Sequence, residues 1–301
     1  MTKRRMHPMC VTCLIKKQQE AISGLADVQR QLEYMQFVAR TVSDNCLTDS
    51  PSLILYKIMR EAQRYFPGAD TDLFAAEKQR FNGMLLPRQE DIYKRITESP
   101  EPLLTALLVS MTGNYIDSGT VSDINEQTLN SIMFDFDRLG CDISAYRKVK
   151  KRISEANRLT VLHDNCGEVV LDKLLIRLLK RDYPDKEIIS VVRGGPVIND
   201  VTLTEARQVG LEEYSLVVES GAAIAGTELE YLSPQARDAV LGADFIISKG
   251  QGNFETLCGC GLPIVYLFLC KCPLQCYRFG CKPLTGVMKL EDGVSLFDTI
   301  E

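Results

Sequence analysis

The sequence predicts an α/β protein whose first half is mainly helical and whose second half forms a mostly parallel β-sheet. Apolar positions in the first half recur every three or four residues, which is the period of an amphipathic helix. The second half contains short apolar, β-rich stretches separated by helical segments, an alternation typical of a parallel sheet. The pattern changes around residues 140–155. We therefore expect a helical domain over residues 1–150 and an α/β domain over residues 151–301.

The helical half predicts several helices in succession. From Leu14 to Val42 the apolar positions follow the helical period. A further helix is expected to begin at Ser50-Pro51, because a serine cap followed by proline in the first turn favours a helix start, and to end at Phe66-Pro67-Gly68. The next expected helices cover Ala75–Asn82, Glu90–Thr97 and Pro102–Met111.

Each expected strand of the second half stops at a polar or glycine-rich cluster. The strands cover Leu159–Leu162, Ile188–Val192, Leu216–Val218, Phe245–Ile247 and Ile264–Leu269. The carboxyl ends of parallel strands meet at one edge of a sheet, and ligands of open α/β sheets bind outside that edge. The predicted site therefore consists of the residues that follow the strands.

Composition excludes some classes of function. The chain has 301 residues, of which 45% are hydrophobic, which is enough for two cores. The 35 basic and 40 acidic residues give a net charge of −5, whereas a general nucleic-acid binder needs a basic face. Met1–Arg5 is basic, but no apolar signal core follows, and the longest apolar run, Leu262–Cys270, is too short to cross a bilayer. We expect a cytoplasmic protein that binds neither membrane nor nucleic acid; its oligomeric state cannot be inferred.

Oxygen-bearing side chains follow the first two expected strands. Asp164-Asn165 comes after the first and opens the helix expected over Glu168–Lys180, and Arg193-Gly194-Gly195-Pro196 leads from the second to Asn199-Asp200. Carboxylate and amide oxygens are ligands that magnesium or manganese prefers, and a helix N-terminus favours anions such as phosphate. Two plainer roles stay open. Asp164 or Asn165 could cap the first helix, and Asp200 could cap the next one.

Two lysines and a glycine-rich segment follow the fourth and fifth strands. Lys249-Gly250-Gln251-Gly252-Asn253 brings glycine-rich backbone to the same edge, and Lys271 ends the last expected strand. Either lysine taken alone is compatible with a solvated charge. Their common position makes them candidates for binding an anionic substrate.

The eleven cysteines are odd in number and unevenly spaced, which favours a reduced compartment over a disulfide framework. Cys10 and Cys13 have the C-x-x-C spacing of a zinc or redox pair. They could instead be small buried hydrophobic residues near a helix start, or share zinc with a second pair from the C-terminal cysteines. Those are Cys258, Cys260, Cys270, Cys272, Cys276 and Cys281.

Together these motifs resemble the metal-dependent damage-control phosphatases, long filed as domain of unknown function 89, which include proteins once proposed to be carboxyl methyltransferases. The motifs are the Asp164-to-Glu168 run, the Arg193 and Asp200 segments, the Lys249-to-Thr256 run K-G-Q-G-N-F-E-T, Lys271-Cys272, and the opening His7-Pro8-Met9-Cys10-Val11-Thr12-Cys13. The C-x-x-C and K-G-Q-G-N-F-E-T runs are similar to the mainly prokaryotic subfamily. The resemblance implies a helical N-terminal domain on a Rossmann-like three-layer α/β/α domain.

The resemblance also implies roles for individual residues. A divalent metal (manganese, magnesium, cobalt or nickel) would be held by Asp164, Asn165 and Asp200, and Lys271 would neutralise phosphate. The implied and suspected substrate-binding residues are Glu168, Asn114, Asp117, Arg193, Lys249, Gly250, Gln251, Gly252 and Asn253. The C-terminal segment contains more cysteine than the family pattern.

The expected reaction is hydrolysis of phosphomonoesters of small metabolites, such as sugar phosphates, nucleotides or damaged metabolites. Metal and Lys271 would stabilise charge on the phosphoryl group while a metal-activated water attacks; covalent attack by Asp164 is the alternative. A nucleotide- or adenosylmethionine-binding protein, for example a methyltransferase, is a second class. Against it, the first strand ends in Asp-Asn rather than in a glycine-rich turn. A third class is an interaction protein whose cysteines bind structural zinc.

Overall fold

A computed structural model describes residues 6–24, 27–67, 72, 74–116 and 133–291. The chain divides into two compact units, Met1–Thr71 and Asp72–Glu301. This division differs from the boundary expected near residue 150. The helices between residues 75 and 155 share a hydrophobic core with the sheet and so belong to the second unit.

The first unit contains three helices, α1 (Pro8–Ile22), α2 (Val28–Asn45) and α3 (Pro51–Tyr65). The periodic stretch from Leu14 to Val42 is two helices rather than one, because α1 ends at Ile22 with Ser23 as its C-cap, and the Asp27 side chain caps the start of α2. Helix α3 begins as predicted, with the Ser50 hydroxyl accepting the Leu53 N–H at 3.1 Å. The core of this unit contains Leu14, Ile22, Tyr34, Val38, Val42, Ile54 and Ile58.

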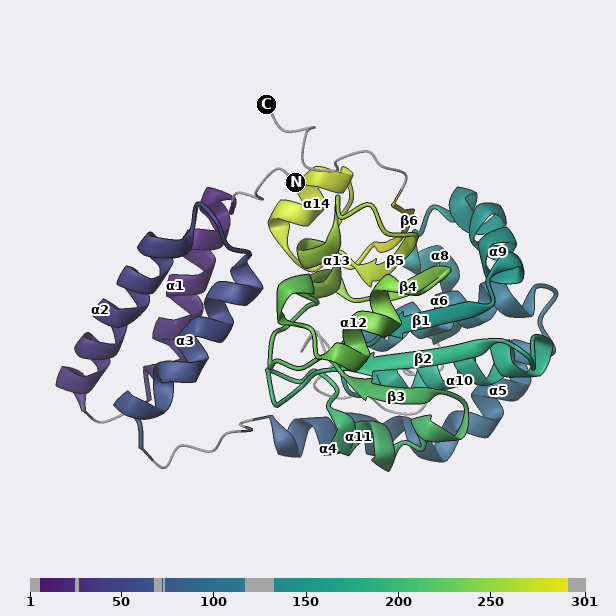
Figure 1. Cartoon of the computed structure of the whole chain (residues 1–301), viewed down its shortest axis with the longest axis horizontal. Coiled ribbons are helices and arrows are strands. Elements are labelled where there is room, and N and C mark those ends of the chain that lie inside the picture. The colour runs from purple at the N-terminus through teal and green to yellow at the C-terminus, as the bar shows by residue number, and fades with distance from the viewer. Residues whose placement is uncertain (1–5, 25–26, 68–71, 73, 117–132, 292–301) are drawn as a thin grey trace. The chain divides into compact units, whose positions relative to one another are not determined.

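The second unit is built on a six-stranded sheet with the order β3-β2-β1-β4-β5-β6 (Figure 1). Strands β1 to β5 are parallel, and β6 is antiparallel to β5. This is the strand order of Rossmann-type sheets, so the expected fold class is confirmed. The strands are β1 (Arg158–Leu162), β2 (Glu187–Val192), β3 (Leu216–Glu219), β4 (Phe245–Lys249), β5 (Ile264–Leu269) and β6 (Gly286–Leu290).

Helices cover both faces of this sheet (Figure 1). One layer contains α4 (Ala75–Leu85), α5 (Gln89–Thr97), α6 (Pro102–Ile116), α8 (Phe136–Leu139), α9 (Tyr146–Glu155), α10 (Glu168–Asp182) and α11 (Leu203–Gln208). The other contains α12 (Pro234–Leu241), α13 (Gln251–Leu257) and α14 (Pro273–Phe279). Short 3₁₀ turns lie at Leu86–Arg88, Ile143–Ala145, Leu211–Glu213 and Leu229–Tyr231.

Alternation along the strands sends side chains to the two layers in turn. On β4, Phe245 and Ile247 pack toward α6 and α10, whereas Ile246 packs toward α12 and α13. The same alternation sends Lys249 toward α6 and α10, where its ammonium contacts the Ser110 carbonyl. The sheet thus determines which layer receives each polar side chain at its carboxyl edge.

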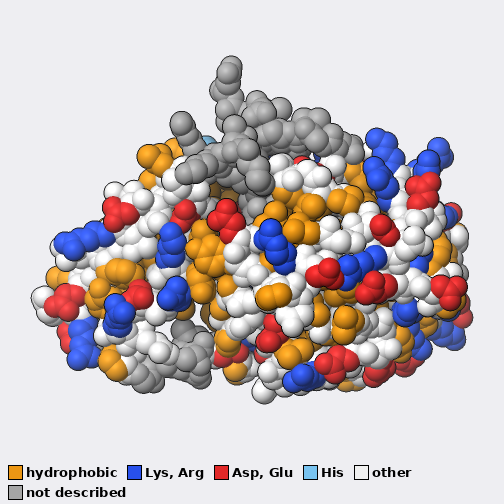
Figure 2. All heavy atoms as spheres, in the orientation of Figure 1, with side chains coloured by type: hydrophobic (Ala, Val, Ile, Leu, Met, Phe, Trp, Pro, Cys, Tyr) orange, Lys and Arg blue, Asp and Glu red, His pale blue; other side chains and the backbone are white. Residues whose placement is uncertain are grey.

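Among the described residues, no helix is long and apolar enough to span a membrane. On the face shown in Figure 2, acidic and basic side chains are interspersed over the described residues.

Candidate active site

The candidate site lies where the strand order reverses, between β1 and β4. Because β1, β2 and β4 are parallel, the residues that follow them meet at one edge of the sheet. Asp164 follows β1, Arg193 follows β2, and Lys249 ends β4. In open α/β sheets this reversal point is where ligands bind.

Arg193 holds the two predicted metal-binding carboxylates. Its Nε donates to Asp200 Oδ2 at 2.5 Å, and its Nη2 lies 3.3 Å from Asp164 Oδ1. The third nitrogen, Nη1, donates to Asn253 Oδ1 at 3.0 Å and to the Gly226 carbonyl at 2.9 Å. The side chain is only 2% exposed. Arg193, expected to bind substrate, therefore binds protein groups and orients Asp164 and Asp200.

The three predicted metal ligands lie together. An isolated antiparallel bridge pairs Asn165 with Asp200, and Asn165 Nδ2 donates to Asp164 Oδ2 at 2.7 Å. Asn165 Nδ2 also donates to Asn114 Oδ1 at 3.3 Å, which leaves the amide oxygen of Asn165 as a candidate ligand atom. Two carboxylates and an amide oxygen are the hard donors that magnesium and manganese prefer, so these residues fit such an ion.

The structure shows neither of the two helix-capping roles considered for these residues. Helix α10 is capped by Gly167, without a side-chain cap hydrogen bond among the described residues. Helix α11 is capped by Thr202, whose hydroxyl and Glu205 form a capping box. Asp164, Asn165 and Asp200 therefore lie at the sheet edge without serving as helix caps.

A second cluster surrounds Lys249. Its ammonium lies 2.5 Å from Glu168 Oε1 and 2.6 Å from Asp172 Oδ1. Ser110 donates its hydroxyl to the same Asp172 oxygen at 2.6 Å, and His163 Nδ1 lies 2.9 Å from the other. Lys249 and Glu168 are fully buried. Neither of these two predicted substrate-binding residues faces solvent, and their charges are balanced inside the protein.

Burial sets the ionisation of this cluster. Desolvation, opposed by Lys249 and assisted by Asp172 and Asp164, raises the pKa of Glu168 from 4.5 to about 8. Burial alone would raise the pKa of Asp172 as well, but Lys249 and His163 outweigh it and lower that pKa. Burial also opposes the charge of Lys249, yet the two carboxylates raise its pKa. Burial therefore makes Glu168 easier to protonate than an exposed glutamate, whereas the ion pair favours the charged forms of Lys249 and Asp172.

Asn114 joins the two clusters. Near the C-terminal end of α6, its Nδ2 donates to Glu168 Oε2 at 2.7 Å while its Oδ1 accepts from Asn165. A continuous hydrogen-bonded network thus runs from Asp200 through Arg193, Asp164, Asn165 and Asn114 to the Lys249 cluster. Asp117, the expected companion of Asn114, lies outside the described residues.

Glycine is required where the backbone approaches the site. Gly250 has φ +80°, and a Cβ at this position would overlap the carboxylate of Asp164. A Cβ at Gly252 would lie 2.5 Å from the Ala225 carbonyl oxygen. The glycine-rich segment therefore lets β4 and α13 pack directly against Asp164 and the loop after β3.

The polar residues of the same segment are tied to protein partners. Asn253 Nδ2 donates to the Lys249 and His163 carbonyls at 2.7 and 3.1 Å, and its Oδ1 accepts from Arg193 and from the Thr227 hydroxyl. Asn253 is fully buried, so in this structure it stabilises the positions of the neighbouring site residues.

Gln251 connects the segment to the turn that carries Lys271. Its Oε1 accepts the Lys271 and Cys272 N–H groups at 3.2 and 3.3 Å. Because β5 is parallel to β4, and β4 to β1, Lys271 lies at the same sheet edge as Asp164. Lys271 is partly exposed, which distinguishes it from the buried Lys249.

Four residues that the prediction did not assign belong to the site. His163, Asp172 and Ser110 complete the Lys249 cluster, and Thr227 binds Asn253. Asp172 had a detectable signal, because it follows Glu168 by four residues and so shares its helix face. Ser110 had none, because it lies 62 residues from its partner.

The N-terminal cysteines lie elsewhere in the chain. Cys10 and Cys13 are on α1 in the first unit, with Cys13 exposed and Cys10 partly buried. Exposure of Cys13 contradicts the interpretation of both as buried hydrophobic residues.

A separate cavity lies at the other end of α6. It is lined by Arg95, Glu98, Ser99, Pro100, Glu101, Thr105, Phe134 and Phe136. Thr105 and Asn114 are nine residues apart on α6, about 14 Å at 1.5 Å per residue. The cavity is therefore separate from the polar network.

Comparisons with known proteins agree with this architecture. A family model described as the damage-control phosphatase ARMT1-like domain matches residues 6–284. A damage-control phosphatase of Pyrococcus horikoshii is 28% identical over 274 residues, covering 88% of this chain and 90% of the relative. One of Archaeoglobus fulgidus is 26% identical over 284 residues, covering 89% and 93%, respectively. An uncharacterized protein of Methanocaldococcus jannaschii is 26% identical over 287 residues, covering 89% and 90%.

A comparison with solved structures finds the same fold. The crystal structure of a DUF89 family protein from Pyrococcus horikoshii superposes with a TM-score of 0.80 and 24% sequence identity, covering 96% of this chain and all of the other. That likeness supports the fold. The family match covers most of the sequence, including all described residues of the polar network, and we conclude that the chain belongs to the damage-control phosphatase ARMT1-like domain family.

Proposed function

We propose that this protein is a metal-dependent phosphatase that hydrolyses phosphomonoesters of small metabolites. Family membership and relatives named damage-control phosphatases support phosphatase chemistry. The observation that carries the proposal for this chain is the grouping of Asp164, Asn165 and Asp200, with both carboxylates bound by Arg193. Sugar phosphates, nucleotides and damaged phosphometabolites are the substrate classes we propose.

The residues of the chain have distinct roles in this proposal. Asp164, Asn165 and Asp200 would hold a divalent metal, which would supply charge stabilisation for the phosphoryl group and activate the attacking water. Arg193 fixes the positions of the Asp164 and Asp200 carboxylates through its hydrogen bonds to both. The Lys271 ammonium would oppose negative charge on the transferring phosphoryl group.

Water is the proposed nucleophile rather than Asp164. Both oxygens of Asp164 already contact nitrogen donors, Oδ1 from Arg193 and Oδ2 from Asn165. An aspartate that attacks phosphorus must present one oxygen in line with the leaving group. The existing contacts favour a ligand role for this carboxylate.

The methyltransferase alternative has less support. A turn after β1 that binds a dinucleotide or adenosylmethionine would need several glycines for close backbone approach, whereas this turn has only Gly167 before α10. Glu168, the first residue of α10, is fully buried against Lys249 and Asn114.

Phosphate release from para-nitrophenyl phosphate tests the proposal. Wild-type activity should vanish with chelator and return with manganese, cobalt, nickel or magnesium. Asp200→Ala should remain folded and lose activity by orders of magnitude, because it removes a metal ligand. The matched control Asp182→Ala, at an exposed aspartate beside Arg181, should keep full activity. Full activity of the metal-free wild type would refute metal dependence, and no release from a panel of sugar phosphates, nucleotides and damaged metabolites would refute the phosphatase assignment.

A further inference from the structure

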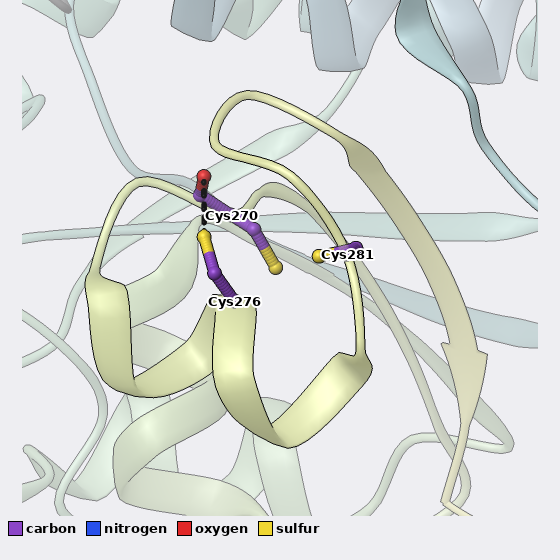
Figure 3. Close-up of side chains that lie close together, drawn as sticks. All are labelled: Cys270, Cys276 and Cys281. Carbon is purple, nitrogen blue, oxygen red and sulfur yellow. Dashed lines mark hydrogen bonds between the residues drawn. The ribbon is translucent and has the colours of Figure 1, made fainter.

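Three thiols converge at the carboxyl end of β5. Cys270 directly follows this strand, Cys276 lies in α14, and Cys281 comes two residues after α14. Every pair of their Sγ atoms lies within 4.8 Å. Figure 3 shows the Cys270 and Cys281 thiols directed toward each other, while the nearby Cys276 Sγ contacts the Cys270 carbonyl oxygen at 3.6 Å.

The backbone holds these cysteines in place. Cys270 donates its N–H to the Thr285 carbonyl at 2.9 Å and accepts the Leu284 N–H at 2.7 Å. Gly280 ends α14 with φ +58°, a left-handed conformation that turns the chain back. As a result the Cys281 N–H reaches the Cys276 carbonyl at 3.0 Å. The thiols are therefore brought together by a defined turn rather than by mobile side chains.

The surroundings are apolar. Cys270 and Cys276 are buried in the same hydrophobic cluster as Phe254 and Phe268, and Phe279 and Cys281 pack against it. None of the three cysteines forms a disulfide. An apolar site lined by sulfur disfavours magnesium and manganese, which require oxygen ligands, and favours a thiophilic ion.

We propose that Cys270, Cys276 and Cys281 bind a structural zinc ion, at a site separate from the oxygen ligands of Asp164, Asn165 and Asp200. Zinc–sulfur bonds of about 2.3 Å in a tetrahedron place sulfur atoms about 3.8 Å apart, so the thiols need to close by at most about 1 Å. Structural zinc sites take four ligands. Cys272, the N-cap residue of α14, is the candidate for the fourth; its thiol is outside the group of three that lie within 4.8 Å of one another, so its side chain would have to turn toward the ion.

A zinc ion at this site would also restrain the turn that carries Lys271. Cys270 and Cys272 flank Lys271, whose N–H is bound by Gln251. Zinc at the three thiols would fix the Cys270 end of the turn that carries this lysine, and a fourth bond from Cys272 would fix the other end. The inference does not depend on phosphatase activity, because the cluster shares no residue with the oxygen site.

Cobalt spectroscopy of the full-length protein tests the proposal. The reduced, metal-free Asp200→Ala protein, which lacks the complete oxygen site, is titrated with cobalt(II) and then with zinc. We expect a thiolate-to-cobalt charge-transfer band with strong tetrahedral d–d absorption, and loss of both when zinc is added. The absence of a thiolate band, with cobalt added in excess, would overturn the proposal.

Cysteine variants locate the signal. Cys281→Ser alters the least buried of the three thiols and should abolish the band or reduce cobalt affinity at least tenfold. Cys258→Ser, in the same apolar cluster but outside the three, should keep the band, as should the double change Cys10→Ser and Cys13→Ser. A band that survives Cys281→Ser and disappears in the double variant would assign the metal to the N-terminal pair and refute the proposal.

Proton release gives a readout without substitutions at the cluster. Cysteine thiols are mostly protonated at pH 7 and lose their protons to bind zinc. Calorimetry of zinc binding to the Asp200→Ala protein, in buffers of different ionisation enthalpy, should give about three or four protons per zinc. A value of about two would fit the N-terminal pair and contradict the three-thiol site.

Discussion

Arg193 explains how two like charges can lie side by side before any metal is bound. Asp164 and Asp200 would repel each other, and a guanidinium that contacts both offsets that repulsion. Its planar fork also fixes the directions of the carboxylates, which a lysine at this position could not do. Sequence spacing predicted that Arg193 lies at the sheet edge, but its role follows from contacts with residues that come after four different strands, β1 to β4.

Lys271 and Lys249 were both candidates for binding phosphate, and their environments separate them. Lys271→Ala should lower kcat/KM by roughly ten- to a thousand-fold, the effect of losing one charge-stabilising group, with bound metal and Tm nearly unchanged. Lys282→Ala, an exposed lysine of the following loop, is the matched control and should behave as wild type. Steady-state kinetics and thermal melts measure both.

Lys249→Ala should lose activity for a different reason, because the variant should be less stable. It would leave Glu168 and Asp172 buried without their cation, and breaking such a pair costs about 3–5 kcal/mol. We therefore expect a large loss of stability along with activity. If Lys271→Ala is fully active and Lys249→Ala is folded but inactive, the proposed position of the phosphate is wrong.

Glu168 predicts a pH dependence of stability. Its pKa is raised by burial from 4.5 to about 8 in the folded protein, so its contribution is fully present below pH 4.5 and is lost as pH rises toward 8. Glutamine cannot ionise, so the Glu168→Gln variant does not lose this contribution to stability as pH rises. In metal-free protein, the Tm of Glu168→Gln relative to wild type should rise steadily from pH 5 to pH 8, whereas Glu98→Gln, at an exposed residue, should show no trend. A constant difference for Glu168→Gln would mean that the folded protein holds this group ionised.

At the level of helices and strands, the sequence pattern predicted the features that depend on residues close together in the chain. All five expected strands are present, because parallel strands form short continuous apolar runs, even in the partly exposed edge strand β3, and α3 starts at its serine–proline signal. Strand β6 was missed: its five residues are paired only with β5 at the sheet edge. The Lys249 cluster was missed as a unit because its members come from α6, α10, β4 and the residue after β1, and only the fold brings them together.

The turn after β4 provides a test of close packing. Gly250→Ala should reduce activity by at least a hundredfold, because its Cβ would displace the Asp164 carboxylate and because φ +80° disfavours alanine. Gly261→Ala is a matched control, since Gly261 has φ +78° but no atom within 4 Å of its Cβ position. Both variants place alanine at a positive φ, which disfavours a side chain, and only the first also disturbs Asp164. Kinetics at equal fractions of folded protein compare them, and equal activities would remove the steric argument.

At the scale of the whole molecule, the unit boundary lies well before the position expected from helix content. The sequence pattern changes where the first strand begins, but a domain is defined by its shared core. Helices α6 and α10 illustrate this, because a Cβ at Gly113 of α6 would lie 2.6 Å from Glu168 Cα. A purely local pattern cannot reveal such packing between segments more than 50 residues apart.

The N-terminal unit contains the C-x-x-C pair but none of the described residues of the polar network. Changing Cys10 and Cys13 together to serine should lower yield or Tm more than turnover, because α1 contributes Leu14 and Ile22 to that unit's core whereas the catalytic residues proposed here are all in the second unit. We expect kcat/KM per folded molecule within about twofold of wild type, a change below 0.5 kcal/mol. The measurement combines thermal melts, metal analysis and kinetics on the double variant, with Cys46→Ser as a control for loss of a thiol elsewhere in the same unit. A folded double variant that loses all turnover at unchanged metal content would place these thiols in the chemistry and the N-terminal unit in the active site.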